Sequence, residues 1–128
     1  MSESCIRVLA DPVQIKNCRA RIEHLKSPIS EIAKILNLSG NEVRLKILYL
    51  LDSEQKMCPC DLSDVLNMSV PAISQHLRKL KDSQLVIDHK IGQTVFYELV
   101  PESITILKPI LKLLTDQSQK GQLEEVQV

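Results

Sequence analysis

The feature that most constrains the fold is the stretch of residues 57–81, in which two cysteines precede two short helical patterns. Cys58-Pro59-Cys60 opens the first helix, which should end near Asn67. Ser69 is a suitable N-cap for the second helix, and Pro71 falls in its first turn, where a missing amide costs nothing. Two helices separated by so short a turn predict a helix-turn-helix.

The second of these helices has one apolar and one polar face. Ile73, Leu77 and Leu80 recur at i, i+4 and i+7, which predicts a buried stripe. The opposite face is polar and basic, as a recognition helix requires if it is to enter a major groove. Glutamine and arginine suit base edges, whereas lysine suits phosphates. The candidate DNA-binding residues are therefore Ser69, Ser74, Gln75, His76, Arg78, Lys79 and Lys81, with Lys90 and Gln93 beyond the helix.

A hairpin is expected directly after the recognition helix. Residues 86–90 and 94–99 are rich in β-branched and aromatic side chains, and Ile91-Gly92-Gln93 joins them. A hairpin in this position is a wing. The predicted fold class is therefore mostly α with a β-hairpin wing, a winged helix-turn-helix.

Helical periodicity predicts four further helices, over residues 12–25, 28–38, 42–51 and 103–119. Ser39 and Glu42 fit a capping box at the start of the third. Pro109 either kinks the last helix or marks its true start. The third helix is apolar almost all round, so we expect it to be central.

The other helices carry apolar stripes that should face protein. The first stripe comprises Ile15, Cys18, Ile22 and Leu25, and the second comprises Ile29, Ile32, Ala33 and Leu36, with Leu38 as a further candidate. The last helix carries Ile104, Leu107, Ile110, Leu111 and Leu114 on one side, with Ile106 and Leu113 on another. This is more than one small domain needs to cover, and we interpret the surplus as a homodimer face.

Length and charge set further limits. The 128 residues, 44% of them hydrophobic, allow one domain over residues 1–120, with a polar and disordered tail over 121–128. The 16 basic and 16 acidic residues cancel, so attraction to nucleic acid must come from local clustering. A long apolar run and a signal-peptide pattern are both missing, so we expect a cytoplasmic protein with no membrane partner. Nothing suggests the nucleophile, base or phosphate loop of an enzyme.

Four cysteines in a reducing cytosol are more plausibly thiols than disulfides. Cys58 and Cys60, at a helix N-terminus that favours thiolate, can ligate one soft ion. Two thiolates suffice for mercury, whereas lead or arsenite usually takes three, and zinc or cadmium takes four ligands. Cys18 and Cys5 are the remaining candidate ligands. The same thiols could instead serve a redox sensor, or a metal-thiolate protein that does not bind DNA.

Four segments, at residues 41–48, 57–62, 69–80 and 92–99, resemble the ArsR/SmtB family of metal-sensing repressors in the same order. The resemblance covers roughly residues 28–118. It implies a winged-helix homodimer paired through its N- and C-terminal helices. It also implies that the metal-free protein occupies operator DNA and that mercury, lead, cadmium or arsenite releases it.

The resemblance also bears on the ligands. In arsenic-sensing members a third cysteine lies one turn after the pair, where this chain has Ser63. In cadmium- and lead-sensing members, N-terminal cysteines complete the pair, a part that Cys5 and Cys18 could play. The family's zinc-type site on the last helix should be absent, because its expected positions hold Pro101, Ser103, Leu114 and Gln117.

Overall fold

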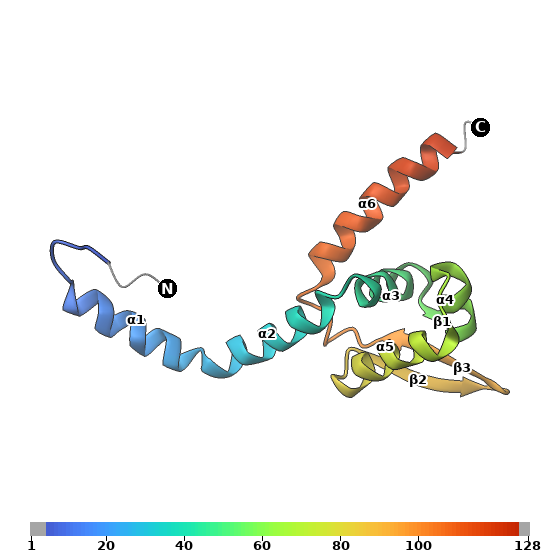
Figure 1. Ribbon diagram of the computed structural model, residues 1–128, viewed down its shortest axis with the longest axis horizontal. Helices are drawn as coiled ribbons and strands as arrows, with labels where there is room; N and C mark the ends of the chain where they lie inside the picture. Colours follow the sequence, from blue (N-terminus) through green and yellow to red (C-terminus); the bar gives the residue numbers. More distant parts are fainter. Residues whose placement is uncertain (1–4, 126–128) are drawn as a thin grey trace. The chain divides into compact units, whose positions relative to one another are not determined.

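The computed structural model describes residues 5–125, with side chains up to Lys120 (Figure 1). The chain divides into two compact units, Met1–Ala33 and Lys34–Val128. The single domain predicted over residues 1–120 stays a prediction. No helix among the described residues combines the length and apolar character needed to cross a membrane.

The first unit contains helix α1 (Pro12–His24) and the start of α2 (Lys26–Ser39). Asp11 caps α1, because its carboxylate accepts hydrogen bonds from the amides of Val13 and Gln14 at 3.0 and 3.1 Å. The stripe predicted to be buried is not covered, and Ile22 is 62% exposed. The reason is that this unit offers α1 no second layer of structure to pack against.

The face predicted for α2 is also wrong within this chain. Ile29, Ile32 and Leu36 are exposed, whereas Ile35, which was not predicted, packs against the core of the second unit. Leu38, the further candidate, also packs there. Helical spacing finds apolar positions but does not say which of two apolar sides meets the core.

Helix α3 (Glu42–Glu54) is central, as expected, with Ile47, Leu48 and Leu51 fully buried. The predicted capping box is wrong, because Ser39 is the last residue of α2 and is itself buried. The N-cap is instead Asn41, whose side-chain oxygen accepts a hydrogen bond from the Arg44 amide at 3.0 Å.

The helix-turn-helix forms as predicted, from α4 (Pro59–Leu66) and α5 (Val70–Asp82). Asn67 ends α4 in the left-handed conformation, with φ of 54°. Ser69 caps α5, because its hydroxyl accepts a hydrogen bond from the Ala72 amide at 3.3 Å. The core that joins these helices to α3 consists of Ile47, Leu48, Leu51, Leu62, Ile73, Leu77, Leu80, Leu85, Val86, Ile104, Leu107 and Leu111.

The wing consists of β2 (Val86–Ile91) and β3 (Thr94–Leu99), which pair antiparallel. Gly92 lies in their turn with φ of +63°, a conformation that glycine adopts without strain. A strand missed by the sequence, β1 (Lys56–Met57), pairs with the other edge of β3, so the sheet has the order β1-β3-β2. Two residues are too few to show strand periodicity.

Helix α6 (Lys108–Glu125) begins one residue before Pro109. This confirms the alternative in which Pro109 marks the start of the last helix and does not kink it. The helix continues past the predicted end at residue 119, and the tail residues 126–128 lie outside the described residues. Its first part packs on α3, with Leu111 buried, and the rest extends away from α3–α5 and the wing (Figure 1). Ile110, Leu113 and Leu114 remain exposed.

Candidate nucleic-acid interface and thiol pair

Helix α5 presents a polar face to solvent because its apolar stripe anchors it to the core. Ile73, Leu77 and Leu80 are fully buried, as predicted. The predicted DNA-binding residues of the helix-turn-helix that the structure leaves exposed are Ser69, Ser74, Gln75, Arg78, Lys79 and Lys81. These side chains supply hydrogen-bonding groups and positive charge suited to base edges and phosphates.

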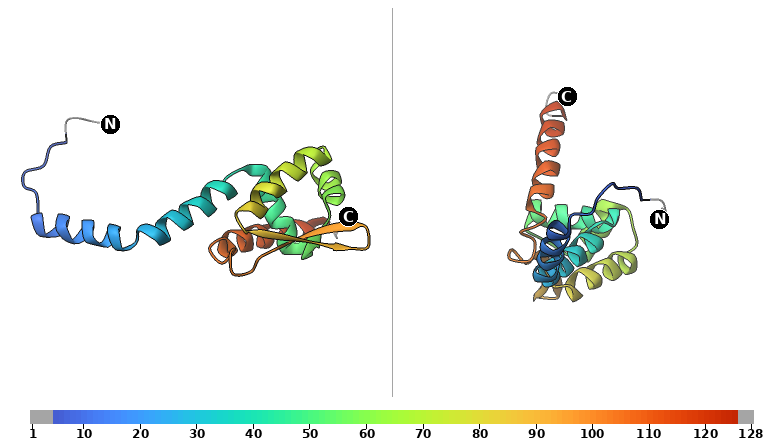
Figure 2. Two further views of the ribbon diagram at one scale, coloured as in Figure 1. Left: turned by 90° about the horizontal axis from the view of Figure 1, so that it is seen from below. Right: turned by 90° about the vertical axis from the view of Figure 1, so that its left-hand side faces the viewer.

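The wing lies beside α5 (Figures 1 and 2). Lys90, near the end of β2, and Gln93, in the turn, are both exposed. The two elements can therefore approach one duplex together, with α5 in a groove and the wing on the adjacent backbone.

Lys81 is less available than the sequence indicated. Its ammonium lies 3.0 Å from the Asp88 carboxylate of β2 and donates a hydrogen bond to it. This hydrogen bond and the negative charge of Asp88 raise the pKa of Lys81. The charge predicted for a phosphate is already paired within the protein.

His76 is also placed differently from the other α5 candidates. It is half-buried, and its Nδ1 lies 3.4 Å from Nη1 of Arg44 on α3. Burial lowers the pKa of His76, and the positive charges of Arg44 and Lys79 lower it further. Its ring faces a protein partner, whereas the prediction assigned it to DNA. Sequence reasoning missed the role of Arg44, because α3 carries a second cation, Lys46, and nothing local distinguishes the two.

The Cys58–Cys60 pair lies where the wing sheet meets the helix-turn-helix. Cys58 is the N-cap of α4, its side chain makes no capping hydrogen bond, and Cys60 is exposed in the first turn. Strand β1 ends directly before the pair, and α4 packs against α5 and contacts β3. A ligand on these thiols would therefore act next to both elements that face DNA.

The other two cysteines belong to the first unit. Cys18 is half-buried, and Nη2 of Arg21 donates a hydrogen bond to its Sγ at 3.1 Å, whereas Cys5 is exposed. The described side chains do not gather three or more cysteine, histidine or carboxylate groups into a possible metal site. The four-thiol ligand set stays a prediction.

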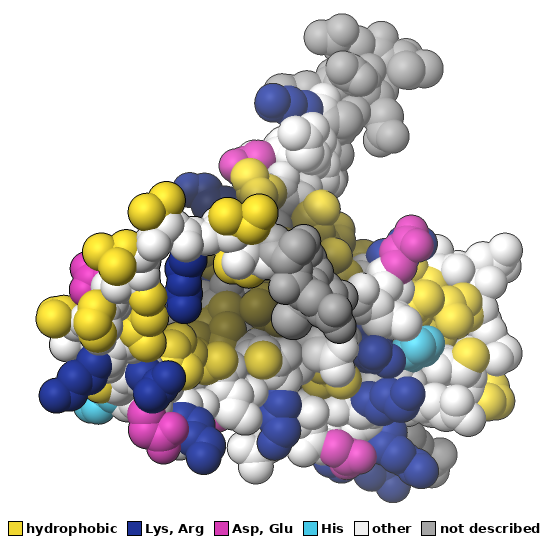
Figure 3. All heavy atoms as spheres, turned by 60° about the vertical axis from the view of Figure 1, so that its left-hand side comes forward, with side chains coloured by type: hydrophobic (Ala, Val, Ile, Leu, Met, Phe, Trp, Pro, Cys, Tyr) yellow, Lys and Arg dark blue, Asp and Glu magenta, His cyan; other side chains and the backbone are white. Residues whose placement is uncertain are grey.

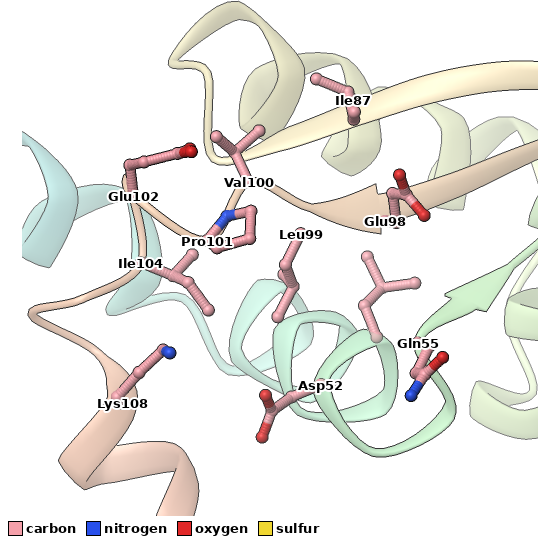
Figure 4. A pocket seen from close by; sticks show the side chains of 11 residues that line it. Asp52, Gln55, Ile87, Glu98, Leu99, Val100, Pro101, Glu102, Ile104 and Lys108 are labelled. Atoms are coloured by element: carbon pink, nitrogen blue, oxygen red, sulfur yellow. The ribbon is translucent and has the colours of Figure 1, made fainter.

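A surface pocket of about 520 Å³ lies at the base of the wing, away from the predicted site residues (Figure 4). Its charged groups are Asp52 from α3, Glu98 from β3, Glu102 from the segment that leads into α6, and Lys108 at the start of α6. No local sequence pattern predicts this pocket, because its lining comes from segments far apart in the chain.

Comparisons with known proteins agree with this arrangement. Residues 41–88 match the family model described as "Bacterial regulatory protein, arsR family". The arsenic resistance transcriptional regulator ArsR1 of Pseudomonas putida is 32% identical over 81 residues, 63% of this chain and 63% of that protein. The cadmium resistance transcriptional regulatory protein CadC homolog of Staphylococcus aureus is 31% identical over 86 residues, 67% of this chain and 71% of that protein.

Solved structures show the same fold. Reduced HlyU from Vibrio cholerae matches with a TM-score of 0.63 and 34% identity, over 74% of this chain and 96% of that chain. The antimony-specific transcriptional repressor AntR matches with a TM-score of 0.60 and 25% identity, over 71% of this chain and 83% of that chain. These matches confirm the predicted resemblance and the expectation that the chain is a regulator and not an enzyme. The chain belongs to the ArsR family of bacterial transcriptional regulators.

Proposed function

We propose that this chain is a metal-responsive repressor that binds operator DNA as a homodimer and leaves it when a soft metal ion binds its cysteines. The exposed polar face of α5, held in place by the buried stripe on its other side, is the observation that carries the DNA-binding part. The wing beside it extends the same surface. Such a protein would act in the bacterial cytoplasm.

Exposed apolar side chains support the homodimer. They include Val13 and Ile22 on α1, and separately Ile110 and Leu113 on α6, where Leu113 is 66% exposed. In Figure 3, hydrophobic side chains are visible on the molecular surface that faces the viewer. Covering such side chains is favourable, and a second copy would also supply a second α5 for a two-fold operator.

The thiol pair supports the metal response. Cys58 and Cys60 are accessible and lie in the first helix of the helix-turn-helix, so a bond to either thiol can act on α5 through α4. Soft ions such as mercury, lead, cadmium and arsenite prefer thiolate ligands. With two thiols in place, one or two further ligands would come from Cys18 and Cys5. Relatives are named for arsenic and cadmium resistance, and AntR for antimony.

Fluorescence anisotropy on a labelled duplex from upstream of the protein's own gene tests this function. Wild type should bind that duplex more tightly than a scrambled one, and one of the four metals should weaken operator binding. Coupling of about 1–3 kcal/mol, or about 5–150-fold in affinity, is typical. Cys58→Ser and Cys60→Ser should bind DNA normally but lose the metal response. A Cys58→Ser variant that responds fully would remove the pair from the mechanism.

A second candidate is a repressor of the same fold that senses oxidants. It is favoured by the Arg21 guanidinium, which donates to the Cys18 thiol, since cationic neighbours are typical of oxidation-sensitive cysteines. Oxidation would join Cys58 or Cys60 to Cys18 or Cys5 in a disulfide, with peroxide reduced to water. Release of operator by peroxide in metal-free buffer, reversed by a thiol reductant, would support this candidate over metal sensing.

A further inference from the structure

Arg44 connects three helices of the second unit. Its amide completes the N-cap of α3 by donating to the Asn41 side chain at 3.0 Å. Its Nε donates to the carbonyl oxygen of Leu38, in the last turn of α2, at 2.7 Å. Its Nη1 lies 3.4 Å from Nδ1 of His76 on α5. The side chain is partly buried, so solvent competes only partly for these contacts.

The chemistry of the two groups fixes which one donates. A guanidinium has five N–H donors, no acceptor, and stays charged in proteins. His76 can therefore accept a hydrogen bond from Arg44 only if Nδ1 carries no proton. The contact selects a neutral imidazole with its proton on Nε2.

We propose that Arg44 and His76 are positioning residues for operator binding, and that their contact sets the rotation of α5 relative to α2 and α3. This inference rests on the proposed function, in which α5 enters the DNA groove. The buried anchors of α5 are apolar side chains, Ile73, Leu77 and Leu80, and hydrophobic contact is not directional. The hydrogen bond from Lys81 to Asp88 is directional, but it is exposed to solvent and lies in the last turn of the helix. A hydrogen bond is directional, so it can fix the helix rotation that apolar packing leaves loose.

The surroundings of His76 make this contact sensitive to acid. The charged groups that act on the imidazole are Arg44 of α3 and Lys79 of its own helix, and both oppose a second positive charge there. The neighbouring carboxylates do not offset them. Asp88 of β2 is bonded to Lys81, while Asp61 and Asp64 of α4 are exposed. Protonation of His76 would remove the acceptor and place two cations side by side.

Operator preference, measured as the ratio of affinities for operator and scrambled duplex, tests the inference. This ratio cancels the general gain in DNA attraction that any added positive charge brings. Between about pH 8 and the pH at which His76 becomes protonated in the folded chain, wild type should lose about tenfold in preference. His76→Asn should keep its preference across this range, because the amide oxygen can accept from Arg44 in place of Nδ1 and does not titrate. In the control variants His24→Asn and His89→Asn, the operator preference should depend on pH as it does in wild type.

Two further measurements separate positioning from folding. His76→Leu and Arg44→Lys should each lose about tenfold in preference at about pH 8 while remaining folded by circular dichroism. The imidazole nitrogen shifts of His76 should report the Nε2-protonated form at the same pH by NMR. A His76→Leu variant that discriminates as well as wild type, or a His76→Asn variant as acid-sensitive as wild type, would overturn the positioning role alone. Equal affinity for operator and scrambled duplex in wild type at every pH would overturn the proposed function instead.

Discussion

The hydroxyl of Ser63 donates a hydrogen bond to the backbone carbonyl of Met68, across the turn between α4 and α5. The carbonyl of Ser63 in turn accepts hydrogen bonds from the amides of Asn67 and Met68, the latter at 3.1 Å. Ser63 therefore bonds to both polar groups of the Met68 backbone. It closes the turn that sets the geometry of the helix-turn-helix.

Ser63→Ala should lower the free energy of unfolding by about 1 kcal/mol, because it removes a partly buried hydrogen bond and leaves the Met68 carbonyl without this donor. Urea unfolding followed by circular dichroism measures this change. Ser53→Ala is the matched control: its hydroxyl also bonds to a backbone carbonyl, that of Leu50, but is exposed. This control should change stability by about 0.5 kcal/mol or less. Equal losses in the two variants would contradict the role given to Ser63.

Ser63→Cys should make the protein more responsive to arsenite. Positions 60 and 63 are three residues apart on α4 and lie on one face of the helix, so the new thiol would join the existing pair. Arsenite usually takes three thiolates. We therefore expect the variant to reach half-maximal operator release at an arsenite concentration at least about tenfold lower than wild type needs. Anisotropy on the operator duplex measures this. Ser83→Cys, with its thiol at the C-cap of α5 and outside the candidate DNA-binding residues, should leave the arsenite response as in wild type.

Folding stability should fall as the solution is acidified below pH 6.5. His76 has its ordinary pKa of 6.5 in the unfolded chain and a lowered pKa in the folded chain, so the unfolded chain binds the proton more readily. The loss continues until the pH reaches the pKa of the folded state. Urea unfolding at a series of pH values should give a flatter profile for His76→Asn than for wild type. A wild-type slope in His76→Asn would assign the acid sensitivity to other groups.

Lys79→Ala and Lys81→Ala remove the same charge from the last turn of α5 but should differ in their effect on DNA binding. Lys79 is exposed, whereas Lys81 is paired with Asp88. A lysine that neutralises a phosphate contributes about 0.9 to the slope of log affinity against log salt concentration. Lys79→Ala should lose about this much, and Lys81→Ala should lose little. Equal losses would restore the sequence-based role of Lys81 in phosphate binding.

The sequence predicted the second unit well where local patterns and packing agree. Ser69 and Pro71 mark the start of α5, and the spacing of its apolar residues shows which face is buried, so both faces of α5 followed. Sequence patterns did not reveal contacts that depend on a distant partner. Lys81 is paired with a residue seven positions away on a strand, and His76 meets a residue 32 positions away.

Other errors came from rules that find a type of residue but not its surroundings. Ser39 and Asn41 are both good caps, and the choice between them was decided by where α2 ends. The stripe on α1 has helical spacing, but spacing does not tell whether the covering surface belongs to the same chain. The thiol pair followed from sequence, whereas its place next to β1 did not, because a strand of two residues leaves no pattern.

Strand β1 also bears on how such a protein can change during evolution. Its two residues are all that separates the α3–β1 connection from the thiol pair, and they attach the pair to β3 of the wing. The side chains suited to choosing the effector lie at the start of α4 and in the first unit, while those suited to choosing the operator lie on α5 and the wing. Substitutions in one set need not disturb the other. A descendant could therefore acquire a new effector while it continued to regulate the same genes.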